Sequence, residues 1–191
     1  MPKSTGAWSK DETAGQHVFS LNLARWIGNF LPKEQPLVDM GCGFGDYLWL
    51  WGQMGFQNLM GVEGSDLGEL FQFKRITVHD LTEPIGIIEK GNVVALEIGE
   101  HIPAQFQELF IQNITFNVAG GCHLVLSWAI PGQGGHGHVN CLPNETVISE
   151  IEKHGFKFLP RESISARDVT EHNVSWFRNT IMIFKKHVEE A

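Results

Sequence analysis

The chain has 191 residues, of which 42% are hydrophobic and 19% charged, so we expect one compact globular unit rather than a disordered, collagen-like or coiled-coil chain. Lys and Arg number 14 against 22 Asp and Glu, and the formal net charge of −8 disfavours nucleic acid as a partner. No apolar run approaches the roughly 20 residues that cross a bilayer, and residues 1–6 lack the apolar core of a signal peptide. We therefore expect a cytoplasmic protein with no membrane partner.

The first 35 residues differ in pattern from the rest. A polar segment containing Trp8 precedes a predicted helix whose apolar positions include Leu21, Trp26 and Phe30, and Pro32 ends this helix. We expect residues 1–35 to pack on the following domain or to cover its site, and residues 36–191 to form that domain.

The next stretch predicts strands that each end at a polar or glycine-rich turn. Residues 36–40 form an apolar run that a glycine turn at 41–45 follows, and helical spacing then begins at Tyr47. A second run, 58–62, ends in Glu63 and precedes a weak helix that reaches about residue 73. A third run, 75–78, ends in His79 and Asp80.

The second half continues the alternation of strands and helices. Residues 92–96 predict a buried strand, 102–118 a helix, and 122–128 a fifth strand that enters the glycine-rich loop 131–138. A helix follows from Asn144 to about Gly155, and then two strands at 156–159 and 176–184 with a polar loop between them. Such alternation predicts an α/β fold with a doubly wound, mostly parallel sheet.

The glycine turn has the sequence Asp39-Met40-Gly41-Cys42-Gly43-Phe44-Gly45. Its spacing is G-x-G-x-G, whereas the dinucleotide fingerprint is G-x-G-x-x-G, so a pyrophosphate cofactor fits less well. An acidic residue followed by this glycine pattern resembles the first motif of the class I S-adenosylmethionine-dependent methyltransferases. The resemblance covers about residues 36–185.

The resemblance implies a single Rossmann-like domain with a seven-stranded sheet whose last strand is antiparallel. It also implies a site for S-adenosylmethionine, in which Glu63 binds the two ribose hydroxyls and Asp80, with Leu81 behind it, meets the adenine amino group. In all, the cofactor-binding residues expected from it are Asp39, Gly41, Cys42, Gly43, Glu63, Asp80, Leu81 and Glu97. Because the carboxyl ends of parallel strands share one edge of the sheet, these side chains should converge.

A second candidate cluster follows the fourth strand, where Glu97, Glu100 and His101 lie within five positions. The Glu-x-x-Glu-His sequence is similar to that of metal-dependent members, including ubiquinone-pathway O-methyltransferases and small-RNA 2′-O-methyltransferases, in which a later histidine completes the site. That resemblance implies Mg²⁺ or another divalent cation at Glu97, Glu100, His101 and His138, a donor set that such ions accept. Two alternatives stay open: a metal-free catalytic site with His101 and Glu100, and acids that only cap the next helix.

Other residues are weaker candidates. Trp8 and Trp128 could wall the sulfonium group, although packing is the commoner role of each, and His17 could face the acceptor. His136 is an alternative to His138 in the glycine-rich loop.

These patterns together predict a methyltransferase that transfers a methyl group to an oxygen, or with less support a nitrogen, of a small molecule. The alternatives are an RNA 2′-O-methyltransferase, a binding protein that holds the cofactor without catalysis, and, least supported, a nucleotide-dependent oxidoreductase. The acceptor and the oligomeric state are not readable from the sequence.

Overall fold

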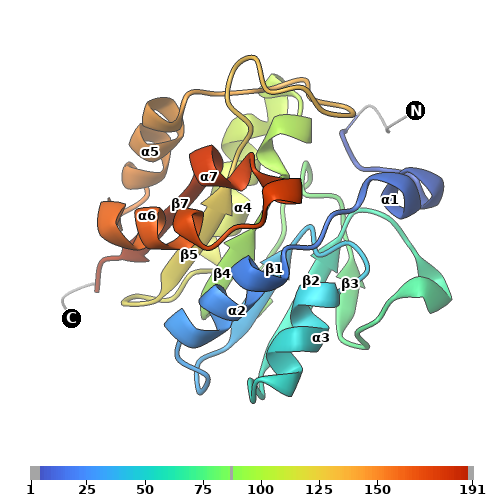
Figure 1. Ribbon diagram of the computed structural model, residues 1–191, viewed down its shortest axis with the longest axis horizontal. Coiled ribbons are helices and arrows are strands. Elements are labelled where there is room, and N and C mark those ends of the chain that lie inside the picture. Colours follow the sequence, from blue (N-terminus) through green and yellow to red (C-terminus); the bar gives the residue numbers. More distant parts are fainter. Residues whose placement is uncertain (1–4, 87, 189–191) are drawn as a thin grey trace.

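The computed structural model describes residues 5–86 and 88–188 and contains a sheet of seven strands between two layers of helices (Figure 1). The strands are β1 (Leu37–Met40), β2 (Leu59–Glu63), β3 (Ile76–Val78), β4 (Asn92–Ala95), β5 (His123–Ser127), β6 (Phe156–Phe158) and β7 (Ile181–Lys186). The helices are α1 (Lys10–Gln16), α2 (Leu21–Phe30), α3 (Asp46–Gln53), α4 (Gln107–Phe116), α5 (Asn144–Glu152), α6 (Pro160–Asp168) and α7 (Phe177–Thr180).

The strand order is β3-β2-β1-β4-β5-β7-β6. Strands β1 to β5 pair in parallel, and β7 lies antiparallel between β5 and β6. The predicted doubly wound sheet with an antiparallel last strand is confirmed. The chain leaves β1 toward β2 on one side and returns to β4 on the other, so the order reverses between β1 and β4, where open α/β sheets bind their ligands.

Each face of the sheet carries its own hydrophobic core because successive strand residues point to opposite faces. Val38 and Met40 of β1 pack with α4 and α5, whereas Leu37 of the same strand packs with α2, α3, α6 and α7. All four β1 residues are buried, as a central strand covered on both faces requires. Among the described residues, no helix is long and apolar enough to cross a membrane.

Four predictions for local structure were wrong. Residues 64–73 contain a single 3-10 turn, Gly68–Leu70, in place of a weak helix, and the helix expected from residue 102 begins at Gln107 after the 3-10 turn Ala104–Phe106. The stretch assigned to a loop between the last two strands holds α6 and the 3-10 turn His172–Val174, and the strand expected at 176–184 begins only at Ile181, after α7. Pro160 starts α6, since proline suits the first helical turn.

The long connection between β3 and β4 is anchored by one buried amide. Asn113 of α4 donates from Nδ2 to the carbonyl oxygens of Leu81 and Glu83, both at 2.9 Å, and its Oδ1 accepts the N–H of Ile85 at 3.0 Å. Asn113 is 3% exposed, so the backbone groups that it binds would have little access to water if the amide were removed. The amide thereby holds the segment that begins with Asp80 and Leu81.

We expect Asn113→Ala to lower the free energy of unfolding by about 2 kcal/mol or more, because an orphaned buried polar group costs about 1–3 kcal/mol. Urea unfolding followed by circular dichroism measures the effect. The control is Gln112→Ala, which removes an exposed amide from the same helix and should change stability by less than about 0.5 kcal/mol. Equal effects of the two substitutions would contradict the anchoring role.

Candidate active site

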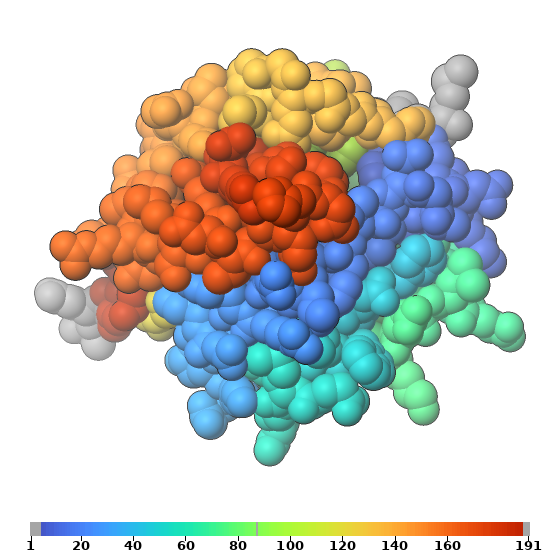
Figure 2. Space-filling model, in the orientation of Figure 1, coloured from blue at the N-terminus to red at the C-terminus, as the bar shows by residue number. Residues whose placement is uncertain are grey.

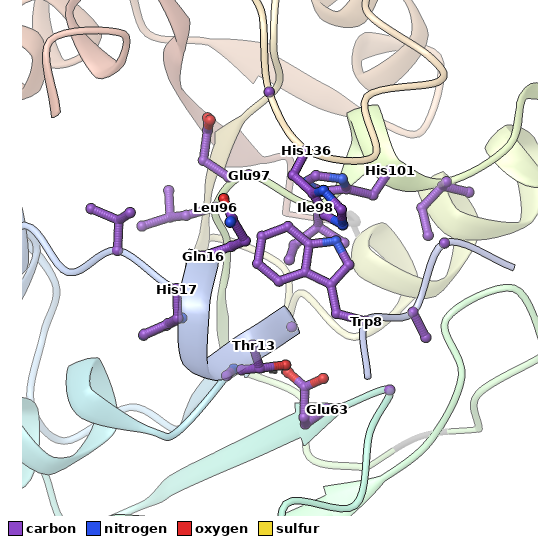
Figure 3. A pocket seen from close by; sticks show the side chains of 18 of the residues that line it. Trp8, Thr13, Gln16, His17, Glu63, Leu96, Glu97, Ile98, His101 and His136 are labelled. Atoms are coloured by element: carbon purple, nitrogen blue, oxygen red, sulfur yellow. Dashed lines mark hydrogen bonds between the residues drawn. The ribbon is translucent and has the colours of Figure 1, made fainter. Parts of the chain in front are cut away.

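A cavity of about 280 Å³ lies at the carboxyl ends of β1, β2 and β4, beside the point where the strand order reverses (Figure 3). The segments that follow these strands form one wall. The N-terminal segment, the glycine-rich loop after β5 and α7 complete the enclosure. Every expected cofactor residue lines this cavity: Asp39, Gly41, Cys42, Gly43, Glu63, Asp80, Leu81 and Glu97.

The turn after β1 needs glycine for two reasons. Gly41 and Gly43 have φ values of 78° and 53°, in the left-handed region that other residues avoid. A Cβ on Gly41 would also collide with the side chain of Ile98, and one on Gly43 would lie 2.5 Å from Nδ1 of His17. The turn therefore leaves bare backbone at the floor of the cavity, which is where a ligand can approach N–H groups.

Glu63 ends β2 with its carboxylate held by backbone N–H groups. Oε2 accepts from Gly43 at 2.8 Å and Oε1 from Ser65 at 3.1 Å. Burial raises the pKa of Glu63, and these hydrogen bonds oppose that rise. A carboxylate offers about four acceptor positions, so the fixed side chain retains acceptor capacity for hydroxyl groups of a ligand.

Asp39 lies beside Glu63 and is 4% exposed. Its Oδ2 is buried and has no hydrogen-bond partner among the described residues. Burial, and secondarily the charge of Glu63, raise the pKa of Asp39 to about 8. Two carboxyl groups with raised pKa values therefore lie at one cavity. A ligand with a positive charge would stabilise their ionised forms and lower both pKa values.

The segment after β3 supplies a third acid. Oδ1 of Asp80 accepts from the N–H and hydroxyl of Thr82 at 3.0 and 2.8 Å, which fixes the carboxylate at the start of the loop. Leu81 is 5% exposed and belongs to the core behind it.

Glu97 follows β4 and is the one described residue other than glycine with a positive φ, at 55°. Ser127 of β5 holds it twice: Oγ accepts the Glu97 N–H at 2.7 Å and donates to Oε1 at 2.8 Å. Burial raises the pKa of Glu97 to about 7. Backbone strain of this kind concentrates at functional sites.

Glu100, His101 and His138 form a compact group whose donor atoms lie within 4.8 Å of one another. Both carboxylate oxygens of Glu100 are buried and lack a hydrogen-bond partner in the described chain. Burial, and then the charge of Glu97, raise the pKa of Glu100 well above its usual value, while burial lowers that of His101 to about 4. Glu97 is not in this group, although it was expected with it.

The loop after β5 is fixed to this group through its backbone. The N–H groups of Val139 and Asn140 both donate to the Glu100 carbonyl at 2.9 Å. Nδ1 of His101 lies 3.2 Å from the Gly137 carbonyl oxygen, and Nδ1 of His138 lies 3.2 Å from that of Gln133. With each Nδ1–H donating to a carbonyl, each Nε2 keeps its lone pair. The Nε2 atom of His138 lies 4.0 Å from Oε1 of Glu100.

Of the weaker candidates, Trp8, His17 and His136 line the cavity and Trp128 does not. Trp8 lines the cavity, and its ring centroid is 4.9 Å from that of His101, edge to face. Trp128 is instead fully buried in the core, where its Nε1 donates to the Asn140 carbonyl. His17 lines the cavity with Nε2 3.2 Å from Asp46, and His136 lies 2.9 Å from Glu12.

Sequence reasoning missed two groups of lining residues. Thr13 and Gln16 belong to α1, a helix that was not predicted, although Ser9 and Glu12 form the capping box that marks its start. Trp176 and Phe177 come from a stretch assigned to a strand, and the Trp176 Nε1 is buried without a partner among the described residues.

No protein-family model matches the sequence, and no curated protein matches it. Solved structures do match the fold. The sugar N-methyltransferase KedS8 from Streptoalloteichus has a TM-score of 0.68 and 14% identity over 87% of each chain. The magnesium protoporphyrin IX methyltransferase of Synechocystis, with bound S-adenosylhomocysteine, has a TM-score of 0.60 and 14% identity over 93% of this chain and 83% of that one.

The chain has the fold of the class I S-adenosylmethionine-dependent methyltransferases. The same fold also occurs in SpnF, described as a [4+2]-cyclase, with a TM-score of 0.61 and 14% identity over 87% of this chain and 80% of that chain. Fold therefore identifies the scaffold, and the activity has to be argued from the cavity.

The raised pKa of Asp39 predicts how the ligand-free protein responds to pH. The folded state keeps the Asp39 proton until about pH 8, whereas the unfolded chain loses it near pH 4. The stability that this proton contributes is thus complete below pH 4 and is lost between pH 4 and 8, by up to about 1.4 kcal/mol per pH unit.

Asp39→Asn does not titrate, so its melting temperature relative to wild type should rise from pH 4 to pH 8 and then level off. Differential scanning fluorimetry across pH 4–9 measures this difference. Asp168→Asn, at an exposed position, is the control and should show no such trend. A pH-independent difference for Asp39→Asn would show that Asp39 is ionised in the folded protein.

Proposed function

We propose that this protein is an S-adenosylmethionine-dependent methyltransferase that methylates an oxygen of a small molecule. The observation that carries the proposal is the convergence of Asp39, Glu63 and Asp80 on one cavity at the reversal of strand order, around bare glycine backbone. The fold of the methyltransferases, one of which holds S-adenosylhomocysteine, supports the cofactor and the transfer of a methyl group, and the choice of oxygen rests on the cavity.

The chemistry of the cavity suits this cofactor. S-adenosylmethionine carries an ammonium and a sulfonium group, and the buried carboxyl groups of Asp39 and Glu63 would both gain from a nearby positive charge. The acceptor capacity left on Glu63 suits the paired ribose hydroxyls. We assign Gly41, Cys42 and Gly43 to the methionine portion, and Asp80 and Leu81 to the adenine.

The donor group Glu100, His101 and His138 fits a divalent cation. Glu100 presents two unpartnered buried oxygens, and each histidine has its Nδ1 against a backbone carbonyl, the arrangement that orients metal-binding histidines. A Cβ on Gly135 would collide with Nε2 of His138, so glycine keeps that nitrogen accessible. We propose that these three residues, with Glu97 as a fourth ligand, hold Mg²⁺ or a similar ion, which would lower the pKa of an acceptor hydroxyl.

In the transfer itself, the methyl carbon leaves the sulfonium sulfur and bonds to the acceptor oxygen, and the hydroxyl proton must go to a base. S-adenosylhomocysteine is then the second product. In a metal-free site, His101 is the base that would take this proton, because it lines the cavity and its Nδ1 faces the Gly137 carbonyl, which leaves Nε2 free to accept. Burial lowers its pKa to about 4, which keeps the imidazole neutral at pH 7 and also makes it a weaker base than an exposed histidine. Glu97, which lines the cavity, would hold the acceptor in line with the cofactor, whereas Glu100 is fully buried and is not among the lining residues.

The enclosed cavity and the acidic charge favour a small acceptor. The cavity is about 280 Å³, and the chain carries a net charge of −8, which opposes the phosphate backbone of an RNA. An RNA 2′-O-methyltransferase, which would use the same Glu and His residues, is therefore the second candidate. A binding protein without turnover is the third.

Cofactor binding is tested by calorimetric titration of S-adenosylhomocysteine. We expect wild type to bind and Glu63→Gln to bind at least 100-fold more weakly, because charged hydrogen bonds contribute about 1.5–3 kcal/mol each. Glu69→Gln, at an exposed position six residues along the chain, should bind as wild type does. The proposal fails if titration of S-adenosylhomocysteine into wild type releases no heat and the ligand does not raise the melting temperature.

The metal is tested with Mn²⁺, whose binding is followed by electron paramagnetic resonance after chelator treatment. We expect Glu100→Gln and His138→Ala to weaken Mn²⁺ binding at least tenfold, and the exposed Glu108→Gln to leave it unchanged. Retained Mn²⁺ binding in both site variants would contradict the assignment. Absence of Mn²⁺ binding in wild type would favour the metal-free reaction with His101 as base.

A further inference from the structure

Residues 5–17, which we call the N-terminal strap, contact the segments that follow four strands of the sheet. The strap meets the turn after β1 through His17, the turn after β2 through Ala7 and Trp8, the segment after β4 through Gly6, and the loop after β5 through Glu12. It lies beside the mouth of the cavity in blue in Figure 2, between the yellow-orange loop above and the cyan and green segments below.

Three consecutive residues cross the cavity. A Cβ on Gly6 would collide with the backbone carbonyl of His101, so the strap backbone lies directly on the β4 segment. A Cβ on Gly64 would lie 2.9 Å from that of Ala7, so the next residue already reaches the β2 turn. The Trp8 carbonyl then accepts a hydrogen bond from the hydroxyl of Ser65.

The Trp8 ring fills the space above Glu63 and faces His101 and His136 (Figure 3). Ser65 ties this position to the cofactor side, because its N–H donates to the Glu63 carboxylate while its hydroxyl donates to Trp8. A molecule bound to Glu63 would therefore lie next to Trp8 and the strap.

The strap is held by side chains. Within the described chain, residues 5–17 exchange no backbone-to-backbone hydrogen bond with the rest of the protein. The ion pair of Glu12 with His136 is partly exposed, with 40% of the histidine side chain accessible, and such pairs contribute about 0–1 kcal/mol. Undocking would break the contacts of Trp8, Glu12 and His17 and the hydrogen bond from Ser65, and it would leave the strand pairing of the sheet intact.

We propose that the N-terminal strap is a cover that must open to admit and release the cofactor and that retains it during the reaction. The inference rests on the proposed function, since it takes S-adenosylmethionine and S-adenosylhomocysteine as the molecules that pass. Trp8 is the residue that closes the mouth, and Ser65 and His136 are its docking points.

The first test removes the closing residue. Trp8→Ala should increase the dissociation rate of S-adenosylhomocysteine at least tenfold, measured by stopped-flow displacement. Trp8→Phe keeps an aromatic ring and should remain within about threefold of wild type. Trp49→Ala, which removes a 52% exposed tryptophan from α3, is the control and should leave the rate unchanged. An unchanged rate in Trp8→Ala overturns the proposal.

The second test locks the cover. Ala7→Cys with Gly64→Cys places two thiols where the Cβ atoms would be 2.9 Å apart, and a disulfide needs roughly 3.5–4.5 Å, so a shift of about 1 Å allows the bond. The single variant Ala7→Cys controls for oxidation of Cys42, Cys122 and Cys141, which are free thiols.

When oxidised, the double variant should take up S-adenosylhomocysteine at least 100-fold more slowly than when reduced, and dithiothreitol should restore uptake. If the ligand is loaded before oxidation, it should stay bound through gel filtration. Equal uptake by the oxidised and reduced forms overturns the cover. Failure of wild type to bind the ligand at all would instead overturn the proposed function, so the two failures are distinguishable.

Discussion

The parallel pairing of β1 with β2 and β4 is the constraint on which the cavity depends. Parallel pairing places the carboxyl ends of these strands at one edge, so the residues that end them meet without further folding information. Asp39 and Glu63 are 24 positions apart in sequence, yet both line one cavity because their strands are neighbours in register. The convergence buries these acids side by side, and burial, with the charge of Glu63 as the smaller cause, raises the pKa of Asp39 so that it keeps its proton in the ligand-free protein.

Much of this arrangement could be predicted because it depends on local pattern. Each strand and the turn after it can be recognised from a short run of neighbouring residues: an apolar stretch, the acid that ends it and the glycines that follow. The sheet topology then follows from the alternation of strands and helices. The wrong assignments share a cause. Residues 160–168 have little apolar character, and α6 buries only Ser163 and Ala166, so the helix depends on tertiary packing that apolar periodicity does not reveal.

The enclosure of the cavity was harder to foresee for a related reason. Trp8, a weak candidate from the sequence, and Trp176 reach the cavity from opposite ends of the chain, and nothing in the sequence around Trp176 marks it as a lining residue. Trp128 shows the converse case: it follows a strand that leads to the site, but Gly99 leaves room for its ring to turn into the core. Side-chain direction at a strand end depends on neighbours that are distant in sequence.

Glu97 has a left-handed backbone conformation, and the Ser127 hydroxyl binds both its backbone N–H and its carboxylate. A glycine would adopt this backbone with less strain, whereas a glutamate gives up about 1 kcal/mol of folding free energy or more. The fold is therefore less stable than it would be with glycine at this position. The direction of the Glu97 carboxylate, in turn, is fixed before any ligand binds. In the methyltransferase that we propose, such a preset acid would need no rearrangement when the acceptor binds, so the strain would be borne once, during folding, and not in each turnover.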